Sequence, residues 1–335
     1  MPTNERKTIQ DIAESANVSK STVSRVLTGS THVTGDKREA VLRVMEELQY
    51  QPNLFARGLA SRRSFTIGVL TQNFGSPFYD AILRGIIQGL LGTDYSPIFA
   101  DGGWQSEIEQ RALRTLAGRH ADGLIVVGGL SEGKVLARFS GERPMIVVGR
   151  KVPELAGHCV AIDNFAAAYS ATQHLINAGH QQIVHITGDM LHQDAAEREA
   201  GYEQALQDAG IAFNPELVIE GNFRRQSGLM GIEMLFTRGR NFSAIFASND
   251  QMAVGARLAL YRRGIRVPDD ISIVGFDDQP DSAYMIPPLT TVRQPAVAMG
   301  ETAAKAILDM LDGKPVVLSP LSTELIARES VARFR

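Results

Sequence analysis

The sequence predicts a small all-α N-terminal domain followed by an α/β core of two lobes, each built on a doubly wound parallel sheet. Three observations predict this fold class. The chain has 335 residues, which is more than one hydrophobic core usually organises. Its first 50 residues carry short apolar patterns with helical spacing. From Phe65 onward, apolar strand-like runs alternate with helical segments.

The composition is that of a soluble globular protein, with 44% hydrophobic and 21% charged residues. A single cysteine, Cys159, excludes a disulfide framework within the chain and fits a reducing compartment. We see no apolar signal-peptide region near the N-terminus, and the apolar stretch at 81–91 is too short and interrupted to span a membrane. These features predict a cytoplasmic protein that does not bind membranes.

The net charge of -3 is distributed unevenly along the chain. Residues 1–63 contain ten Lys and Arg against seven Asp and Glu, whereas the rest of the chain contains 24 against 30. A basic N-terminal part on an acidic body indicates that this part meets a polyanion such as DNA, although the excess is small.

The N-terminal domain reads as three helices. Thr8 and Asp11 form a capping-box pattern at the start of the first helix, and a short turn at Asn17 and Val18 follows it. The second helix is predicted at 20–27 and the third at about 36–48. Two helices joined by so short a turn and supported by a third predict a helix-turn-helix, which places its second helix in the major groove of DNA.

The core contains runs that are apolar throughout and rich in Val and Ile. Such runs, separated by helices, indicate parallel strands that are covered on both faces. Ligands of open parallel sheets bind at the carboxyl ends of the strands, so a two-lobed core should bind its ligand in the cleft between the lobes. The predicted strands are 65–70, 96–101, 122–128, 145–150, 159–163, 182–188, 243–248 and 271–277.

The sequence shows no constellation typical of an enzyme. Its seven histidines and Cys159 lack the spacing of a metal site, and no G-x-S-x-G nucleophile elbow is present. The glycine-rich segment GGWQSEIE at 102–109 lacks the Lys-Ser/Thr pair of a P-loop. We therefore expect no catalytic residues, no metal and no cofactor.

The N-terminal 70 residues resemble a known family. TIQDIAESANVSKSTVSRVLTG at 8–29 and HVTGDKREAVLRVMEELQYQPNLFARGLASRRSFTIGVL at 32–70 are similar to the head, hinge and first core strand of LacI/GalR transcriptional repressors, the lactose-, galactose- and purine-repressor-like proteins. The resemblance covers nearly the whole chain, and continues through VAIDN (160–164), AGHQQIVHITG (178–188), R-x-x-G-Y (198–202), FSAIFASNDQMAVGA (242–256), VPDDISIVGFDD (267–278) and PPLTTVRQP (287–295).

This resemblance implies a periplasmic-binding-protein-like core whose lobes exchange segments, with crossovers near Asp163, Arg293 and Leu321. The C-terminal segment STELIARESVARFR resembles the family ending without a leucine-heptad tail, so we expect a homodimer rather than a tetramer. The implied domains are a helix-turn-helix at 1–50, a hinge at 51–64, an N-terminal lobe at 65–163 and 294–321, and a C-terminal lobe at 164–293 and 322–335.

The resemblance also assigns residues that contact a palindromic double-stranded operator. Base edges would be read by N-terminal side chains of the second helix, phosphates would be held around it, and Leu59 of the hinge would wedge into the minor groove. The alternatives are a solvated helix face and a Leu59 that packs on Phe55 or the core. The base-reading positions are Lys20, Ser21 and Arg25, with Ser24 beside them; Thr8, Ser19, Thr22 and Asn53 would hold phosphates, and Ala56 matches the hinge.

A second set of residues is assigned to a small effector. Arginine offers a rigid fork of donors and carboxylates offer acceptors, which hydroxyl-rich sugars need, while aromatic faces cover a sugar's apolar side. For the two strand-end aspartates, the alternative is a structural cap. The resemblance assigns Asp163, Arg198, Asn249 and Asp277; the loops and strand ends add Phe78, Tyr79, Arg150, His192, Asp194 and Phe223.

The predicted function is a sequence-specific DNA-binding transcriptional repressor whose operator affinity is controlled allosterically by a small effector. A mono- or disaccharide acting as inducer is the first interpretation, and a purine- or nucleoside-type corepressor is the alternative. A solute-binding protein for transport would share the core, but it would need an export signal and no DNA-binding head. An enzyme would need a nucleophile or cofactor motif.

Overall fold

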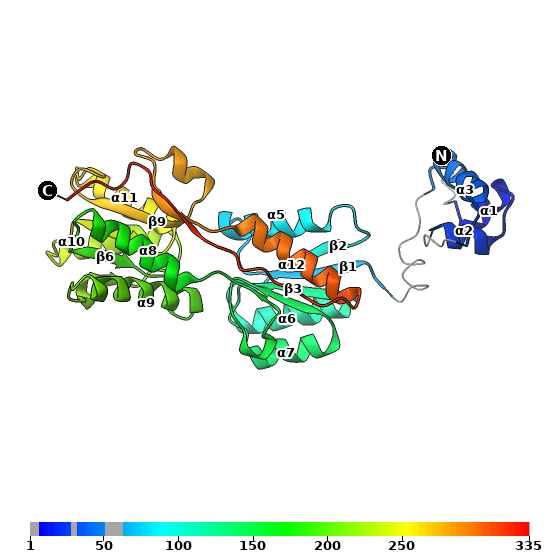
Figure 1. Cartoon of the computed structure of the whole chain (residues 1–335), viewed down its shortest axis with the longest axis horizontal. Coiled ribbons are helices and arrows are strands. Elements are labelled where there is room, and N and C mark those ends of the chain that lie inside the picture. Colours follow the sequence, from blue (N-terminus) through cyan, green and yellow to red (C-terminus); the bar gives the residue numbers. More distant parts are fainter. Residues whose placement is uncertain (1–6, 28–31, 51–62, 335) are drawn as a thin grey trace. The chain divides into compact units, whose positions relative to one another are not determined.

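The computed structural model describes residues 7–27, 32–50 and 63–334. The chain divides into two compact units, Met1–Phe65 and Thr66–Arg335 (Figure 1). Among the described residues, no helix is both long and apolar enough to cross a membrane.

The N-terminal unit contains three helices, as predicted: α1 (Ile9–Ser15), α2 (Lys20–Leu27) and α3 (Gly35–Glu47). Each helix contributes apolar side chains to one small core, and the fully buried ones are Ile12, Val23 and Val41. The turn between α1 and α2 passes through Asn17, whose φ of 50° is left-handed, a conformation that asparagine tolerates better than most residues. This turn sets α2 against α1 in the helix-turn-helix arrangement.

The first lobe of the second unit is built on a five-stranded parallel sheet with the order β2-β1-β3-β4-β5. Helices α5 and α12 pack on one face of this sheet, and α6 and α7 lie on the other (Figure 1). The strands are β1 (Thr66–Thr71), β2 (Ser96–Asp101), β3 (Gly123–Val127), β4 (Met145–Val148) and β5 (Cys159–Val160); the helices are α5 (Pro77–Leu90), α6 (Ser106–Gly118), α7 (Gly133–Glu142) and α12 (Ala296–Leu311).

The second lobe is built on a six-stranded sheet with the order β11-β10-β9-β8-β6-β7. Its strands are parallel except for the edge strand β11, which pairs antiparallel to β10. The strands are β6 (Ile183–Ile186), β7 (Val218–Ile219), β8 (Ala244–Ala247), β9 (Ser272–Asp277), β10 (Thr290–Arg293) and β11 (Glu324–Ile326); the helices are α8 (Asn164–Asn177), α9 (Gln193–Asp208), α10 (Arg225–Thr237) and α11 (Asp250–Arg262).

Alternating strand residues face opposite helix layers, which explains why the strands are apolar throughout. On β8, Ala244 and Phe246 join the cluster that includes α8 and α9, whereas Ile245 and Ala247 join the cluster of α10 and α11. On β3, the same alternation separates Ile125 from the neighbouring Leu124 and Val126. A strand in the middle of such a sandwich has no solvent face, so it carries no polar alternation.

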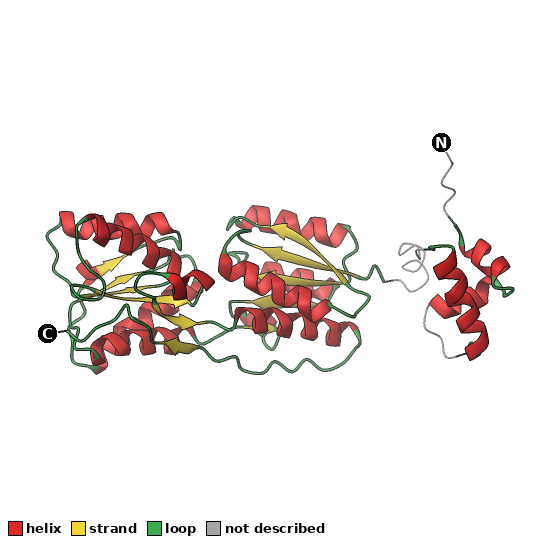
Figure 2. Cartoon of the chain, turned by 90° about the horizontal axis from the view of Figure 1, so that it is seen from above, coloured by secondary structure: helices red, strands yellow, loops and turns green. Residues whose placement is uncertain are grey.

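The chain passes between the lobes three times: from β5 to α8, from β10 to α12, and from α12 to β11 (Figure 2). These positions agree with the expected crossovers near Asp163, Arg293 and Leu321. The residue boundaries that the sequence assigns to the lobes and hinge stay a prediction. Three strands, β7, β10 and β11, were not among the predicted apolar runs.

Candidate functional site

Helix α2 exposes the side chains that the sequence assigns to DNA. Lys20, Ser21, Ser24 and Arg25 are exposed and Thr22 is half-buried, while Val23 and Val26 are buried on the opposite face. The helix therefore presents a polar and basic surface along its length. This is the surface that a recognition helix needs in the major groove.

Two of the assigned phosphate-holding residues hold helix starts. Thr8 caps α1: its backbone N–H donates to the Asp11 carboxylate at 2.7 Å, and its hydroxyl accepts from the Asp11 N–H at 3.4 Å. The first of these bonds contributes most to lowering the pKa of Asp11. Ser19 lies before α2, where its hydroxyl accepts from the Thr22 N–H at 3.2 Å. Asn53, Ala56 and Leu59 lie outside the described residues.

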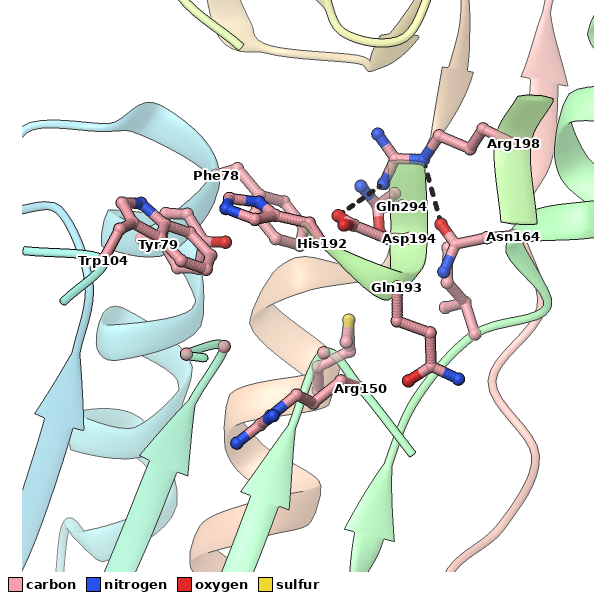
Figure 3. Close-up of a pocket in the computed structure, with 15 residues that line it drawn as sticks. Phe78, Tyr79, Trp104, Arg150, Asn164, His192, Gln193, Asp194, Arg198 and Gln294 are labelled. Carbon is pink, nitrogen blue, oxygen red and sulfur yellow. Dashed lines mark hydrogen bonds and ion pairs between the residues drawn. The ribbon is translucent and has the colours of Figure 1, made fainter. Parts of the chain in front are cut away.

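A pocket opens where the strands of the first lobe end and α9 of the second lobe begins (Figure 3). Its empty volume is about 450 Å³, including space open to solvent. Both lobes contribute lining residues to this pocket. In each sheet the carboxyl ends of the parallel strands lie at one edge, which is where ligands of such sheets bind. The lining residues are Phe78, Tyr79, Trp104, Gly128, Gly129, Gly149, Arg150, Ile162, Asn164, His192, Gln193, Asp194, Arg198, Gln294 and Met299.

Arg198 is the buried cation of this pocket, with only 3% of its surface exposed. Its Nε donates to the Asn164 side-chain oxygen at 3.0 Å, and Nη1 donates to the Ser248 carbonyl. Nη2 lies 3.5 Å from the Asp194 carboxylate, one helical turn earlier on α9. The guanidinium also lies 3.9 Å above the ring centroid of Phe276. These contacts fix the plane of the guanidinium fork.

Asp277 lies beside this cluster at the end of β9. Its carboxylate accepts from the Gln294 amide at 2.7 Å and from the Gln279 amide at 3.1 Å. Burial raises the pKa of Asp277 to about 6, and the nearby Arg198 charge opposes that rise. Its φ of 112° is unusual for a non-glycine residue. Asp277 thus positions Gln294, which lines the pocket.

Aromatic rings form another wall. Tyr79 of α5 meets Trp104 edge to face with centroids 5.7 Å apart, and Trp104 stacks on His192 at 4.0 Å. His192 in turn stacks on Phe223 at 5.6 Å. Burial lowers the pKa of His192, although the carboxylates of Asp194, Asp189 and Glu109 oppose the shift. The imidazole is therefore neutral near pH 7.

Arg150 approaches the pocket from the end of β4. Its Nη2 donates to the Ser131 carbonyl at 2.8 Å, but its buried Nε has no hydrogen-bond partner among the described residues. Burial lowers the pKa of Arg150, and the Glu109 charge opposes the shift. Glu109 itself is fully buried and accepts from the Leu130 and Ser131 N–H groups. The first lobe therefore offers a donor that a polar ligand could use.

The structure brings six of the ten predicted effector residues into the pocket lining: Phe78, Tyr79, Arg150, His192, Asp194 and Arg198. Phe223, Asn249 and Asp277 are not among the lining residues. Phe223 stacks on His192 and Asp277 accepts from Gln294, and both of these partners line the pocket. The Asn249 amide donates to the Phe223 carbonyl at 2.9 Å, and its side-chain oxygen caps α11.

Asp163 is exposed and is not among the lining residues, so its assignment to the effector stays a prediction. Its carboxylate accepts from the Ala166 N–H at 2.8 Å and caps α8, which was the alternative considered for it. The next residue, Asn164, contacts Arg198 instead: its side-chain oxygen accepts a hydrogen bond from the guanidinium. Trp104, Asn164, Gln193 and Gln294 were missed. Asn164 and Gln294 lie in the segments VAIDN and PPLTTVRQP, and Trp104 in the segment considered only as a P-loop.

Among the described residues, no group of three or more His, Cys, Asp or Glu side chains could hold a metal ion.

Comparisons with known proteins agree with this geometry. Residues 8–53 match the family model of bacterial regulatory proteins of the lacI family, and residues 172–331 match a periplasmic binding protein-like domain. The ribose operon repressor of Haemophilus influenzae is 35% identical over 329 residues, covering 97% of this chain and 98% of that protein.

Two solved structures extend the similarity to the whole fold. The lac repressor dimer bound to operator and the anti-inducer ONPF has a TM-score of 0.88 and 29% identity, covering 98% of this chain and all of that one. The complex of the transcriptional regulator CelR with cellobiose has a TM-score of 0.73 and 35% identity, covering 97% and 100%. With its helix-turn-helix head, its two-lobed core and these relatives, this chain belongs to the LacI family of transcriptional regulators and is not an enzyme.

Proposed function

We propose that this protein is a homodimeric repressor that binds a palindromic operator through α2 and releases it when a small effector enters the pocket between the lobes. The exposed row of Lys20, Ser21 and Arg25 on α2 supports DNA reading. The related lac repressor is a dimer on its operator. Because a DNA-binding regulator acts where the chromosome is, we place the protein in the cytoplasm.

The DNA-reading role can be tested by gel shift on a palindromic operator selected from random sequence. We expect Arg25→Ala to weaken specific binding by about 1–3 kcal/mol and to relax the base preference at one position. Lys20→Ala should also weaken specific binding. Arg43→Ala, an exposed arginine on α3, is the matched control. If Arg43→Ala weakens binding as much as Arg25→Ala, the assignment of α2 is wrong.

The effector that fits the pocket best is a mono- or disaccharide. The single observation that carries this choice is the fixed Arg198 fork with Asp194 and Asn164 beside it, next to the aromatic wall of Trp104 and Tyr79. Hydroxyl groups need such donors and acceptors in fixed geometry, and the C–H face of a sugar ring needs an aromatic surface. Two relatives are named for ribose and cellobiose.

Thermal unfolding of the purified protein with a panel of sugars and nucleosides tests this effector class. A ligand at 100 times its dissociation constant should stabilise the folded chain by about 2.7 kcal/mol. Stabilisation by sugars supports the proposal. If nucleosides stabilise the protein and sugars do not, the sugar class is wrong.

A purine- or nucleoside-type corepressor is the second candidate, favoured by the flat stack of Trp104 and His192. Operator titration with each stabilising compound separates the two mechanisms. An inducer lowers operator affinity, whereas a corepressor raises it.

A further inference from the structure

The imidazole of His192 lies between two aromatic rings that come from different lobes. Its plane is tilted by 23° from Trp104 and by 22° from Phe223, with ring centroids 4.0 Å and 5.6 Å away. Trp104 follows β2 of the first lobe, whereas His192 and Phe223 follow β6 and β7 of the second lobe. Rotation of the imidazole about its Cβ–Cγ bond would break both stacking contacts. The two neighbouring rings therefore fix the plane of the imidazole.

Trp104 is itself held by the first lobe. Its backbone has a left-handed φ of 56°, and its N–H donates to the buried side-chain oxygen of Gln72 at 3.2 Å. The ring meets Tyr79 edge to face, so the indole has a defined direction. In Figure 3, Trp104 and His192 approach each other from the α5 side and the α9 side of the pocket. The stack is therefore a contact between the lobes.

His192 lines the pocket, yet one of its nitrogens is unused. The residue is 9% exposed, and its buried Nδ1 has no hydrogen-bond partner in the part of the chain that the structure describes. Burial lowers the pKa of this imidazole; the charges facing it are Asp194, Asp189 and Glu109, which oppose the shift, and Arg198, which reinforces it. A buried polar atom without a partner is unfavourable and favours a ligand that supplies one.

We propose that Trp104 is a positioning residue of the effector site: together with Phe223 it clamps His192 so that the free Nδ1 is offered to a hydroxyl group of the effector. A hydroxyl suits this atom in either tautomer, because it both donates and accepts. The clamp needs a ring from each lobe, so a ligand held by His192 also holds the lobes in the arrangement that forms the stack. This inference rests on the proposed function in taking a hydroxyl-rich effector.

The clamp can be tested without any effector, because Trp104 is the only tryptophan of the chain. A protonated imidazole stacked on an indole quenches its emission. In the full-length protein, the emission should fall between pH 8 and pH 5 with a midpoint below 6.5, since burial disfavours the charged imidazole. His192→Phe keeps a ring but has no proton, so its emission should not change over this range.

His174→Phe is the matched control, because it removes a half-buried histidine on α8 and should leave the transition unchanged. A transition that persists in His192→Phe, or that is absent from the unsubstituted protein, would overturn the clamp.

Calorimetry with D-ribose, D-galactose and cellobiose tests the recognition step. We expect Trp104→Leu and His192→Phe each to weaken sugar binding by about tenfold, the scale of one lost hydrogen bond, and Trp104→Phe to rescue most of it. The double variant should bind no more weakly than His192→Phe, because Trp104 acts through His192. If the two losses multiply, Trp104 contacts the sugar itself and the positioning role is wrong. If none of the three sugars binds, the proposal that the effector is a sugar is wrong. The pH titration of Trp104 emission still tests whether Trp104 and Phe223 clamp His192.

Discussion

Arg198 joins the separate parts of the pocket into one arrangement. It projects from α9, but its guanidinium reaches Asn164 at the start of α8 and the Ser248 carbonyl after β8. A lysine could not replace it, because only the planar guanidinium has donors in several fixed directions. Its buried charge is balanced by the Asp194 carboxylate and by the aromatic face of Phe276.

Arg198→Ala should therefore weaken effector binding by about 2–3 kcal/mol, because it removes charged donors from a buried site. It should also lower the free energy of unfolding, since Asn164, Asp194 and the Ser248 carbonyl lose their partner. Titration calorimetry measures the first effect and denaturant unfolding the second. Arg224→Ala, an exposed arginine near the same lobe edge, is the control. An unchanged affinity in Arg198→Ala would remove Arg198 from the site.

Asp277 makes the stability of the folded chain depend on pH. Burial raises its pKa from 3.8 to about 6, so the folded chain holds a proton that the unfolded chain has lost between these values. The unfolding free energy should therefore fall as pH rises from about 4 to about 6, and this loss should level off above that range. The neighbouring Asp250, whose pKa burial raises to about 7, adds a loss of the same sign.

Urea unfolding of the wild type and of Asp277→Asn at pH 4, 5, 6 and 7 measures this difference. The wild type should lose stability relative to the variant over this range. Parallel pH profiles for the two proteins would show that Asp277 has its ordinary pKa.

The sequence predicts much of which residues lie near the site, but it does not predict which of their side chains face the pocket. Arg198 begins the recognisable R-x-x-G-Y segment on α9, His192 lies just before that helix, and both line the pocket. Asp163 and Asn164 are adjacent in VAIDN, and the sequence favours the charged one. In the structure, Asp163 caps α8, so its side chain turns toward the N–H groups at the start of that helix. Asn164, the next residue, contacts Arg198 in the pocket instead. Trp104 has no such local signal.

At the scale of elements, strands that lie in continuous apolar runs were predictable, and strands without such a run were not, whether they lie at a sheet edge or inside the sheet. Each of the eight apolar runs overlaps a strand. β2 matches its run, β1 is shifted by one residue, and the other six strands are shorter than their runs. β7 has only two residues, and β10 begins with two threonines. β11 lies at the sheet edge and is partly exposed. Such strands owe their existence to pairing with a neighbour, which no local pattern records.

The first lobe depends on a close contact between α5 and α12, which lie far apart in the sequence. Gly85 of α5 faces the backbone of α12, where an added Cβ would lie 2.0 Å from the Val297 carbonyl oxygen. Gly300 of α12 faces the Ile82 carbonyl of α5 in the same way, at 2.1 Å. Glycine at both positions lets the two helix backbones approach each other without side chains between them.

Gly85→Ala should therefore force the helices apart and lower the free energy of unfolding by about 1–3 kcal/mol. Gly141→Ala is the matched control, because an added Cβ at this helical glycine of α7 meets no atom of the described chain within 4 Å. It should leave stability unchanged or raise it by about 0.5–1 kcal/mol, since alanine favours helices over glycine. Thermal or urea unfolding checks both variants. Equal effects would mean that the α5–α12 contact tolerates a side chain.

At the scale of the whole molecule, the segment that joins the helix-turn-helix to the core includes residues 51–62, which lie outside the described residues. Its role is therefore argued from the family resemblance. The family resemblance gives Leu59 the role of a wedge in the minor groove. Leu59→Ala should then lower specific operator affinity by a few kcal/mol, because unstacking a base step needs an apolar side chain. Weak, salt-sensitive binding to random DNA should persist, since it depends on charges such as Lys20. Gel shifts at two salt concentrations separate the effects, and an equal loss on both DNAs would argue against a wedge.

The two binding activities must influence each other by the same factor in both directions. If the effector lowers operator affinity, then operator must lower effector affinity equally, typically by about 5–150-fold for a coupling of about 1–3 kcal/mol. Operator titrations with and without the sugar measure one side of this cycle, and calorimetry of the sugar with and without operator measures the other. We expect the two factors to agree for the wild type.

Arg198→Ala should weaken sugar binding while operator affinity without sugar is retained, because the residue lies in the core unit and α2 in the N-terminal unit. A sugar that tightens operator binding would make the protein a corepressor-dependent repressor, and a sugar that binds without changing operator affinity would show that the two sites are not coupled.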